Sequence, residues 1–208
     1  NEGTIIGNLI NTLSTDWIGG TLEGNFTNNS NATLQSLSKD GNAGTITGNL
    51  INAGSIVSLT QGTIGTSLDN QAGGIIDTLH SSVVGNLSNA GAVKDFIVDS
   101  DMDYTGNGSI TNSLVVQDNG GKGYTLTIGN NGAGNLNFNA TNGSGTIDNA
   151  GTINGNITNV SGSTIADFTN SGSFNGALTN NGSITNFENQ LGGNFTGNIT
   201  NTAGDTIS

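Results

Sequence analysis

Three aspartates at alternate positions, Asp99, Asp101 and Asp103, are the residues of this 208-residue chain best placed to do chemistry. Alternate residues of a strand point to one side, so the three carboxylates could offer oxygen ligands to Ca²⁺. The spacing begins like a calcium-binding EF-hand loop, but Tyr104 stands where that loop needs glycine and Ile110 where it needs a bidentate glutamate. We therefore favour a solvated strand face, predict no metal site and no cofactor, and retain the three aspartates only as metal candidates.

Two other arrangements bear on hydrolysis. His80, the only histidine, follows Leu79 at an outward or corner position, and no serine is marked as a nucleophile for Ser-His-Asp catalysis. Asp148 and Asp167 lie 19 residues apart, so they could stack at about 4.8 Å on successive strands, as a glycosidase would need two nearby carboxylates. They occupy different parts of the repeat described below, so we predict that the chain is not an enzyme.

A Gly-rich hexapeptide lies between two β-rich runs, 114–117 and 124–128. It consists of Asp118, Asn119, Gly120, Gly121, Lys122 and Gly123. A phosphate-binding loop would need Ser or Thr after the lysine and then a helix, and neither is present. The pattern predicts a hairpin or a loop that leaves the fold, which would be a candidate contact site. A length variation without function is an equally good interpretation.

A repeat must position all of these residues. Its unit is apolar, any, small, any, apolar, any, Asn, as in Ile5-Ile6-Gly7-Asn8-Leu9-Ile10-Asn11. Eight copies occur, and their final asparagines are Asn11, Asn28, Asn52, Asn70, Asn89, Asn159, Asn180 and Asn201. The period of two places both apolar residues and the small residue on one face of a strand. We predict that the asparagines form a hydrogen-bonded ladder at the turns, although each could serve only as a turn residue.

A second unit alternates with the first and carries two apolar residues three apart, as in Leu34 and Leu37. One unit of each kind makes a coil of about 21 residues. We therefore predict an all-β parallel β-helix, or β-solenoid, of about ten coils. The regular coils cover 1–96 and 146–208 of one continuous domain, and an irregular section covers 97–145.

Charge and composition exclude several partners. The formal net charge is −12, with three lysines and no arginine, so a nucleic-acid partner is not expected. No apolar run is long enough to span a bilayer, so we expect no membrane insertion by this segment. The chain contains no cysteine and no proline, which excludes disulfides and suits export in an unfolded form.

The run Asn149-Ala150-Gly151-Thr152-Ile153-Asn154-Gly155-Asn156-Ile157-Thr158-Asn159 resembles the β-helical passenger domains of bacterial autotransporters, the type V secretion proteins. The resemblance covers roughly 1–96 and 146–208. It implies a right-handed parallel β-helix, displayed on the bacterial surface or secreted, and an adhesin-like, non-enzymatic role in cell adhesion or self-association. The expected partners are a second copy of the chain or a host-surface glycan or protein.

Two alternatives stay open: a solenoid segment of a secreted oligomerising toxin, and a β-helical carbohydrate-active enzyme. The chain starts and stops within its own repeat pattern, so we expect it to be a segment of a longer passenger.

Overall fold

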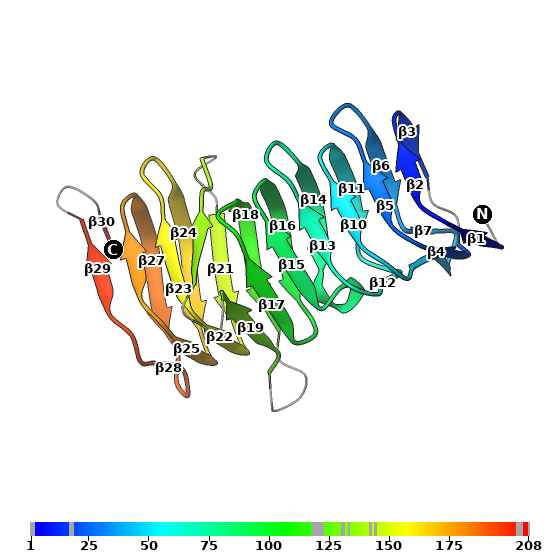
Figure 1. Cartoon of the computed structure of the whole chain (residues 1–208). Helices are drawn as coiled ribbons and strands as arrows, with labels where there is room; N and C mark the ends of the chain where they lie inside the picture. The colour runs from blue at the N-terminus through cyan, green and yellow to red at the C-terminus, as the bar shows by residue number, and fades with distance from the viewer. Residues whose placement is uncertain are drawn as a thin grey trace.

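The computed structural model describes residues 3–16, 19–117, 123–129, 132, 134–141, 143, 145–202 and 206–207. It confirms an all-β, parallel β-solenoid, with the blue N-terminal turns and the red C-terminal turns at opposite ends of the stack (Figure 1). The solenoid makes about nine turns rather than about ten. Two central turns are longer than predicted, because Tyr104 pairs with Ile128 and Leu126 pairs with Ile153, 24 and 27 residues further on.

Three parallel sheets, which we name A, B and C, form the sides of the solenoid. Sheet A contains β1 (Thr4–Ile6), β4 (Thr21–Glu23), β9 (Thr45–Ile46) and β12 (Thr63–Ile64). Sheet B contains β2 (Leu9–Asn11), β5 (Phe26–Asn28), β10 (Leu50–Asn52), β13 (Leu68–Asn70), β15 (Asn86–Asn89), β17 (Met102–Thr105), β19 (Thr125–Ile128), β22 (Thr152–Asn154), β25 (Ser173–Asn175) and β28 (Asn194–Phe195).

Sheet C is the largest, with 14 strands. Its unbranched part contains β3 (Ser14–Thr15), β6 (Thr33–Ser36), β11 (Ser55–Leu59), β14 (Ile75–His80), β16 (Ala92–Val98) and β18 (Ser109–Val116). One branch then contains β20 (Asn135–Phe138), β23 (Asn156–Asn159), β26 (Leu178–Asn180) and β29 (Ile199–Asn201). The other contains β21 (Gly145–Asn149), β24 (Thr164–Asn170), β27 (Ser183–Asn189) and β30 (Thr206–Ile207).

Two short elements lie outside this pattern. The strands β7 (Ser38–Lys39) and β8 (Asn42–Ala43) form an antiparallel hairpin, and η1 (Ser81–Val83) is a single 3₁₀ turn. Within the described residues, no helix is long and apolar enough to cross a lipid bilayer.

The core is a thin column of apolar side chains along the solenoid axis. In β10, for example, Leu50 and Asn52 are buried while Ile51 between them is only partly buried. Leu50 stacks between Phe26 and Leu68 of the neighbouring turns, and all three side chains are fully buried. The predicted period of two therefore sets the inward and outward faces, because successive side chains of a strand point in opposite directions.

Sheet C lengthens turn by turn while sheet A ends. The strands β6, β11, β14, β16 and β18 contain four, five, six, seven and eight residues. Val98 and Val116 are buried and follow the preceding inward residues by two, so they extend the alternation. At the equivalent place after Leu59 stands the polar Gln61, and β11 ends at Leu59 before reaching it. Sheet A has no described strand after β12.

The long strand β18 then divides sheet C into its two branches. Ser109 and Ile110 pair with β20, whereas Ser113 to Val116 pair with β21. The two branches and sheet B supply three sides again. The predicted irregular section thus continues the parallel stack and changes its cross-section.

The repeat unit consequently changes sides between the two halves of the molecule. The strand that ends in Asn28 belongs to sheet B, whereas the strand that ends in Asn159 belongs to sheet C. The sequence distance agrees with this shift, because the 70 residues from Val83 to Ile153 exceed three 21-residue turns by seven, a third of a turn. We call this change the phase shift.

The asparagine ladder predicted from the repeat is confirmed, and in the N-terminal half it has defined ends. The Nδ2 atoms of Asn11, Asn28, Asn52 and Asn70 each donate to the Oδ1 atom of the next asparagine at 2.8 Å, up to Asn89. At the lower end, the Leu13 backbone N–H donates to Asn11 Oδ1. At the upper end, Asn89 Nδ2 donates to the buried hydroxyl of Tyr104 at 3.1 Å, and that hydroxyl donates to the Gly108 carbonyl.

The eight predicted asparagines do not form one column. Beyond the phase shift, Asn159 donates to Asn180 and Asn180 to Asn201, in a second ladder. A third ladder, which the repeat unit did not predict, joins Asn149, Asn170 and Asn189.

Both later ladders begin above an apolar residue. Asn149 pairs with Val116 and Asn159 with Phe138 in the turn below. Neither side chain beneath can donate a hydrogen bond. The buried Oδ1 atoms of Asn149 and Asn159 therefore have no hydrogen-bond partner within the described part of the protein. An unsatisfied buried acceptor costs about 1–3 kcal/mol, so each ladder start is a local cost in stability.

Candidate functional site

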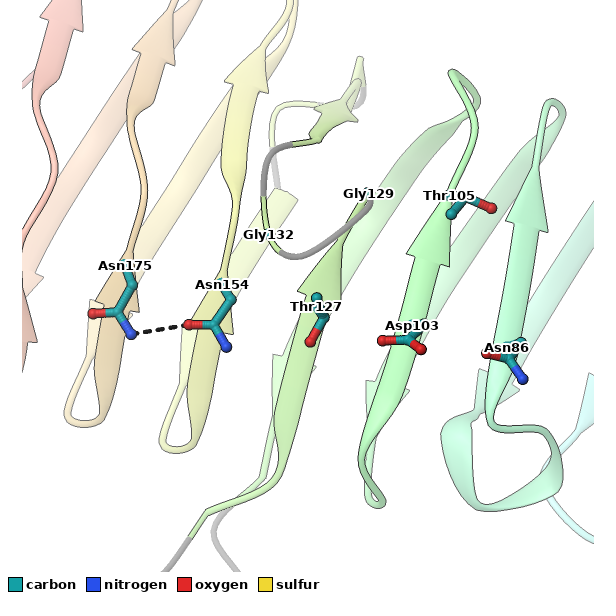
Figure 2. Close-up of a pocket in the computed structure, with 8 residues that line it drawn as sticks. All are labelled: Asn86, Asp103, Thr105, Thr127, Gly129, Gly132, Asn154 and Asn175. Carbon is teal, nitrogen blue, oxygen red and sulfur yellow. Dashed lines mark hydrogen bonds between the residues drawn. The ribbon is translucent and has the colours of Figure 1, made fainter.

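A row of polar side chains crosses the outer face of sheet B at the phase shift. Five residues occupy one register position on five successive strands. They are Asn86, Asp103, Thr127, Asn154 and Asn175, which we name the groove column. Figure 2 shows the five side chains standing in a row across the strands. They line a groove of about 1020 Å³, together with Thr105, Gly129 and Gly132.

Several polar atoms of the groove column have no hydrogen-bond partner in the part of the chain that the structure describes. Asn175 Nδ2 donates to Asn154 Oδ1 at 3.0 Å, which is the dashed contact in Figure 2. Among the residues that the structure describes, none hydrogen-bonds to the Asp103 carboxylate, the Thr127 hydroxyl or Asn154 Nδ2. Asp103 is also the only charged side chain among the described residues that line the groove. The groove therefore offers free acceptors and free donors to a ligand.

The structure separates the three aspartates that were metal candidates. The chain turns between β16 and β17, so they do not share one strand face. Asp99 contacts His80 and Ser82, Asp101 accepts the Thr125 backbone N–H, and Asp103 lies in the groove. The prediction that the three aspartates lie on one solvated strand face is therefore wrong. No group of three or more potential metal ligands occurs among the described residues.

His80 has a partner that its sequence neighbourhood did not reveal. Its Nδ1 atom lies 2.8 Å from Asp99 Oδ2 in the next turn. The Ser82 hydroxyl donates to the same Asp99 oxygen at 2.9 Å, and the Ser82 backbone N–H donates to Oδ1 at 2.8 Å. Burial raises the pKa of Asp99, but the hydrogen bonds from Ser82 and His80 outweigh it and hold the pKa below its ordinary value.

This cluster has the residue types of a catalytic triad without its geometry. In a triad the histidine lies between the serine and the aspartate, so that it can take the serine proton. Here Ser82 donates directly to Asp99, as does the Ser81 hydroxyl at 3.3 Å. Asp99 instead accepts hydrogen bonds from the first turn of η1 and fixes the corner at which sheet A ends.

The carboxylate pair that was considered for hydrolysis, Asp148 with Asp167, is not formed. Asp148 pairs in register with Thr169, and Asp167 pairs with Thr146, so the two aspartates are not stacked. Asp148 accepts a hydrogen bond from the Thr169 hydroxyl and Asp167 accepts one from Asn186. Residues 19 apart do not stack here because the local turn contains 21 residues, as the pairing of Asp148 with Thr169 shows.

Most of the predicted contact loop, residues 118–122, lies outside the described residues. Gly123 is described, with a φ of +61°. At the base of the loop the Tyr124 N–H donates to the Gln117 carbonyl at 2.9 Å. The alternative that the flanking runs form a hairpin is wrong, because β18 belongs to sheet C and β19 to sheet B.

Sequence reasoning did not find the groove column. Its members have five different sequence contexts, and their spacings vary from 17 to 27 residues. A signal was nevertheless present, since each precedes or follows an inward apolar residue by one position.

Known proteins offer no guide to the site. The chain matches no family model, no curated protein and no solved structure.

Proposed function

We propose that this chain is a non-enzymatic adhesive or structural segment of a bacterial surface-displayed or secreted protein, and that it mediates adhesion or self-association. The confirmed β-solenoid and the resemblance of the repeat to autotransporter passenger domains both support the proposal. The arrangement of the outward side chains of sheet C supports it most directly.

Ten outward residues of sheet C form a column that stays in register along the whole solenoid. Each residue pairs with the next through the strands of sheet C and its first branch. The column consists of Ser14, Thr33, Ser55, Ile75, Ala92, Ser109, Asn137, Thr158, Thr179 and Thr200. Seven of the ten carry a hydroxyl and one carries an amide, so the column presents hydrogen-bonding groups in nearly every turn.

The sheet C column crosses the phase shift without interruption, unlike the buried asparagine ladder. Its members repeat at the strand spacing of about 4.8 Å, which a second copy of the same solenoid also has. Two such faces could therefore align over many turns. Each exposed hydrogen bond contributes little, but many contacts formed together give a strong attachment through multivalency.

The experiment displays the chain on cells that do not aggregate by themselves and measures their clumping and their attachment to surfaces. We expect clumping or attachment, and we expect it to weaken when Thr158→Glu and Thr179→Glu place charges in adjacent turns of the sheet C column. The matched control is Thr21→Glu with Thr45→Glu, which are paired outward threonines in adjacent turns of sheet A. Displaying cells that neither clump nor attach would contradict the proposal. If both variants lose clumping or attachment equally, the sheet C column is not the adhesive surface.

A further inference from the structure

Two members of the groove column, Asp103 and Thr127, differ from the equivalent residues in the earlier turns of sheet B, because their side chains make no hydrogen bond within the described residues. Before the groove, the same position of sheet B is occupied by Asn8, Asn25, Asn49 and Ser67. These side chains bond to one another or to the next turn, because Asn8 Oδ1 accepts the Asn25 N–H and Asn25 Oδ1 accepts the Asn49 N–H. The Ser67 hydroxyl likewise donates to Asn49 Oδ1. In the groove, by contrast, Asp103 and Thr127 have no such partner within the described residues.

The chemistry of the groove excludes several kinds of ligand. A peptide that adds a strand needs a free sheet edge, but β17, β19 and β22 each pair with a strand on both sides. The described lining residues are Asn, Asp, Thr and Gly, with no apolar side chain to receive a peptide anchor. Phosphate-rich or acidic polymers are opposed by Asp103 and by the net charge of −12.

The period of the groove fits an extended neutral polymer. Five side chains at about 4.8 Å intervals span about 19 Å along the solenoid axis. A neutral glycan carries hydroxyl groups on every unit, and each hydroxyl both donates and accepts hydrogen bonds. A carboxylate is a strong acceptor for such hydroxyls, and amides supply both donors and acceptors.

We propose that the groove column binds a neutral oligosaccharide whose chain runs along the solenoid axis. The Asp103 carboxylate accepts sugar hydroxyls at the second of the five positions, and Thr127 and Asn154 Nδ2 contact the sugar units that follow. This proposal deepens the adhesive function and rests on it, since it names the partner class of one face.

The test uses the whole chain and neutral cello-, malto- and chito-oligosaccharides, from disaccharide to hexasaccharide, with affinity measured by calorimetric titration. We expect at least one series to bind, with an affinity that rises with length and becomes constant once the ligand spans the five side chains. Asp103→Ala should weaken binding about tenfold or more, as expected for loss of hydrogen bonds to a charged acceptor. Circular dichroism confirms that each variant keeps the strand content of the parent chain.

Asp69→Ala is the matched control, because Asp69 is also a partly exposed aspartate on the outer side of sheet B but lies outside the groove. We expect its affinity to equal that of the parent chain. The proposal is overturned if no neutral series binds at millimolar concentration, if acidic oligosaccharides bind more tightly, or if both aspartate variants lose affinity equally. Clumping of displaying cells without any neutral-glycan binding would contradict this inference while leaving the adhesive function in place.

Discussion

The N-terminal turns, up to about residue 96, and the C-terminal turns, from about residue 146, are built from one repeat unit that lies on different sides of the solenoid. In the first region, the strand ending in Asn28 belongs to sheet B; in the second, the strand ending in Asn159 belongs to sheet C. The unit therefore determines its own strand and turn but not the side that it occupies. The side depends on how many residues the preceding turns contain.

The two regions also differ at the ends of their ladders. The N-terminal ladder is satisfied at both ends, by the Leu13 N–H and by the Tyr104 hydroxyl. The C-terminal ladders begin at Asn149 and Asn159, whose Oδ1 atoms have no partner among the described residues. A phase shift thus has a cost, because each new asparagine column must begin above a residue that belongs to the old pattern.

The core of the C-terminal region contains an aromatic block that offsets part of this cost. Phe168 stacks on Phe187 at 4.9 Å between ring centroids, and Phe174 stacks on Phe195 at 4.6 Å. Such pairs contribute about 0.5–1.5 kcal/mol each beyond the area that they bury. That is of the same order as the cost of one unsatisfied oxygen.

The largest expected effect comes from removing an asparagine inside the N-terminal ladder. Asn70→Leu leaves the Nδ2 atom of Asn52 and the Oδ1 atom of Asn89 without their ladder partners. We expect a loss of about 3 kcal/mol in the free energy of unfolding, measured by urea denaturation followed by circular dichroism. The matched change Asn149→Leu removes one unsatisfied oxygen and leaves another, because Asn170 Oδ1 loses the Asn149 Nδ2 donor, so it should cost about 1 kcal/mol or less.

The difference between these two variants is the measurement that matters. If Asn149→Leu destabilises the chain as much as Asn70→Leu, the unsatisfied Asn149 Oδ1 atom does not lower the stability of the folded chain. The comparison between satisfied and unsatisfied ladder ends would then fail.

The second effect concerns Tyr104, which ends the N-terminal ladder. Tyr104→Phe keeps the ring in the core but removes the acceptor of Asn89 Nδ2 and the donor to the Gly108 carbonyl. We expect a loss of about 1–3 kcal/mol in the free energy of unfolding. Phe26→Leu, at a fully buried ring that stacks between Leu9 and Leu50 and touches no ladder position in register, controls for the packing of a core ring alone.

The same tyrosine predicts a specific pH dependence. Burial raises the pKa of Tyr104 to about 12, although the hydrogen bond with Asn89 lowers it somewhat. Above the ordinary pKa of 10 the unfolded chain loses this proton while the folded chain keeps it. Stability from this group is therefore complete below about pH 10 and falls as pH rises toward 12. Tyr104→Phe should lose less stability than the parent chain across that pH range. An identical loss would mean that a group other than Tyr104 causes the pH dependence.

The sequence predicts the local structure well because period two and the turn residues act locally. Leu50, Asn52 and their equivalents lie where the repeat unit places them. The phase shift was visible only as a 70-residue gap, because no local pattern records the side of the solenoid on which a strand lies. The groove column and the His80–Asp99 pair join residues of different turns, and turn lengths that vary from 17 to 27 residues conceal their register.

The smallest effect would convert an unsatisfied ladder end into a satisfied one. Val116 and Val98 are both fully buried and stack in successive turns, but only Val116 lies beneath the unpaired Asn149 oxygen. Threonine has nearly the shape of valine, so Val116→Thr supplies a hydroxyl donor to Asn149 Oδ1, whereas Val98→Thr buries a hydroxyl beneath an apolar neighbour. We expect Val116→Thr to be more stable than Val98→Thr by about 1 kcal/mol in urea denaturation. Equal stability would mean that a donor to Asn149 Oδ1 does not stabilise the chain. The unsatisfied ladder end would then not be the source of the stability cost at the phase shift.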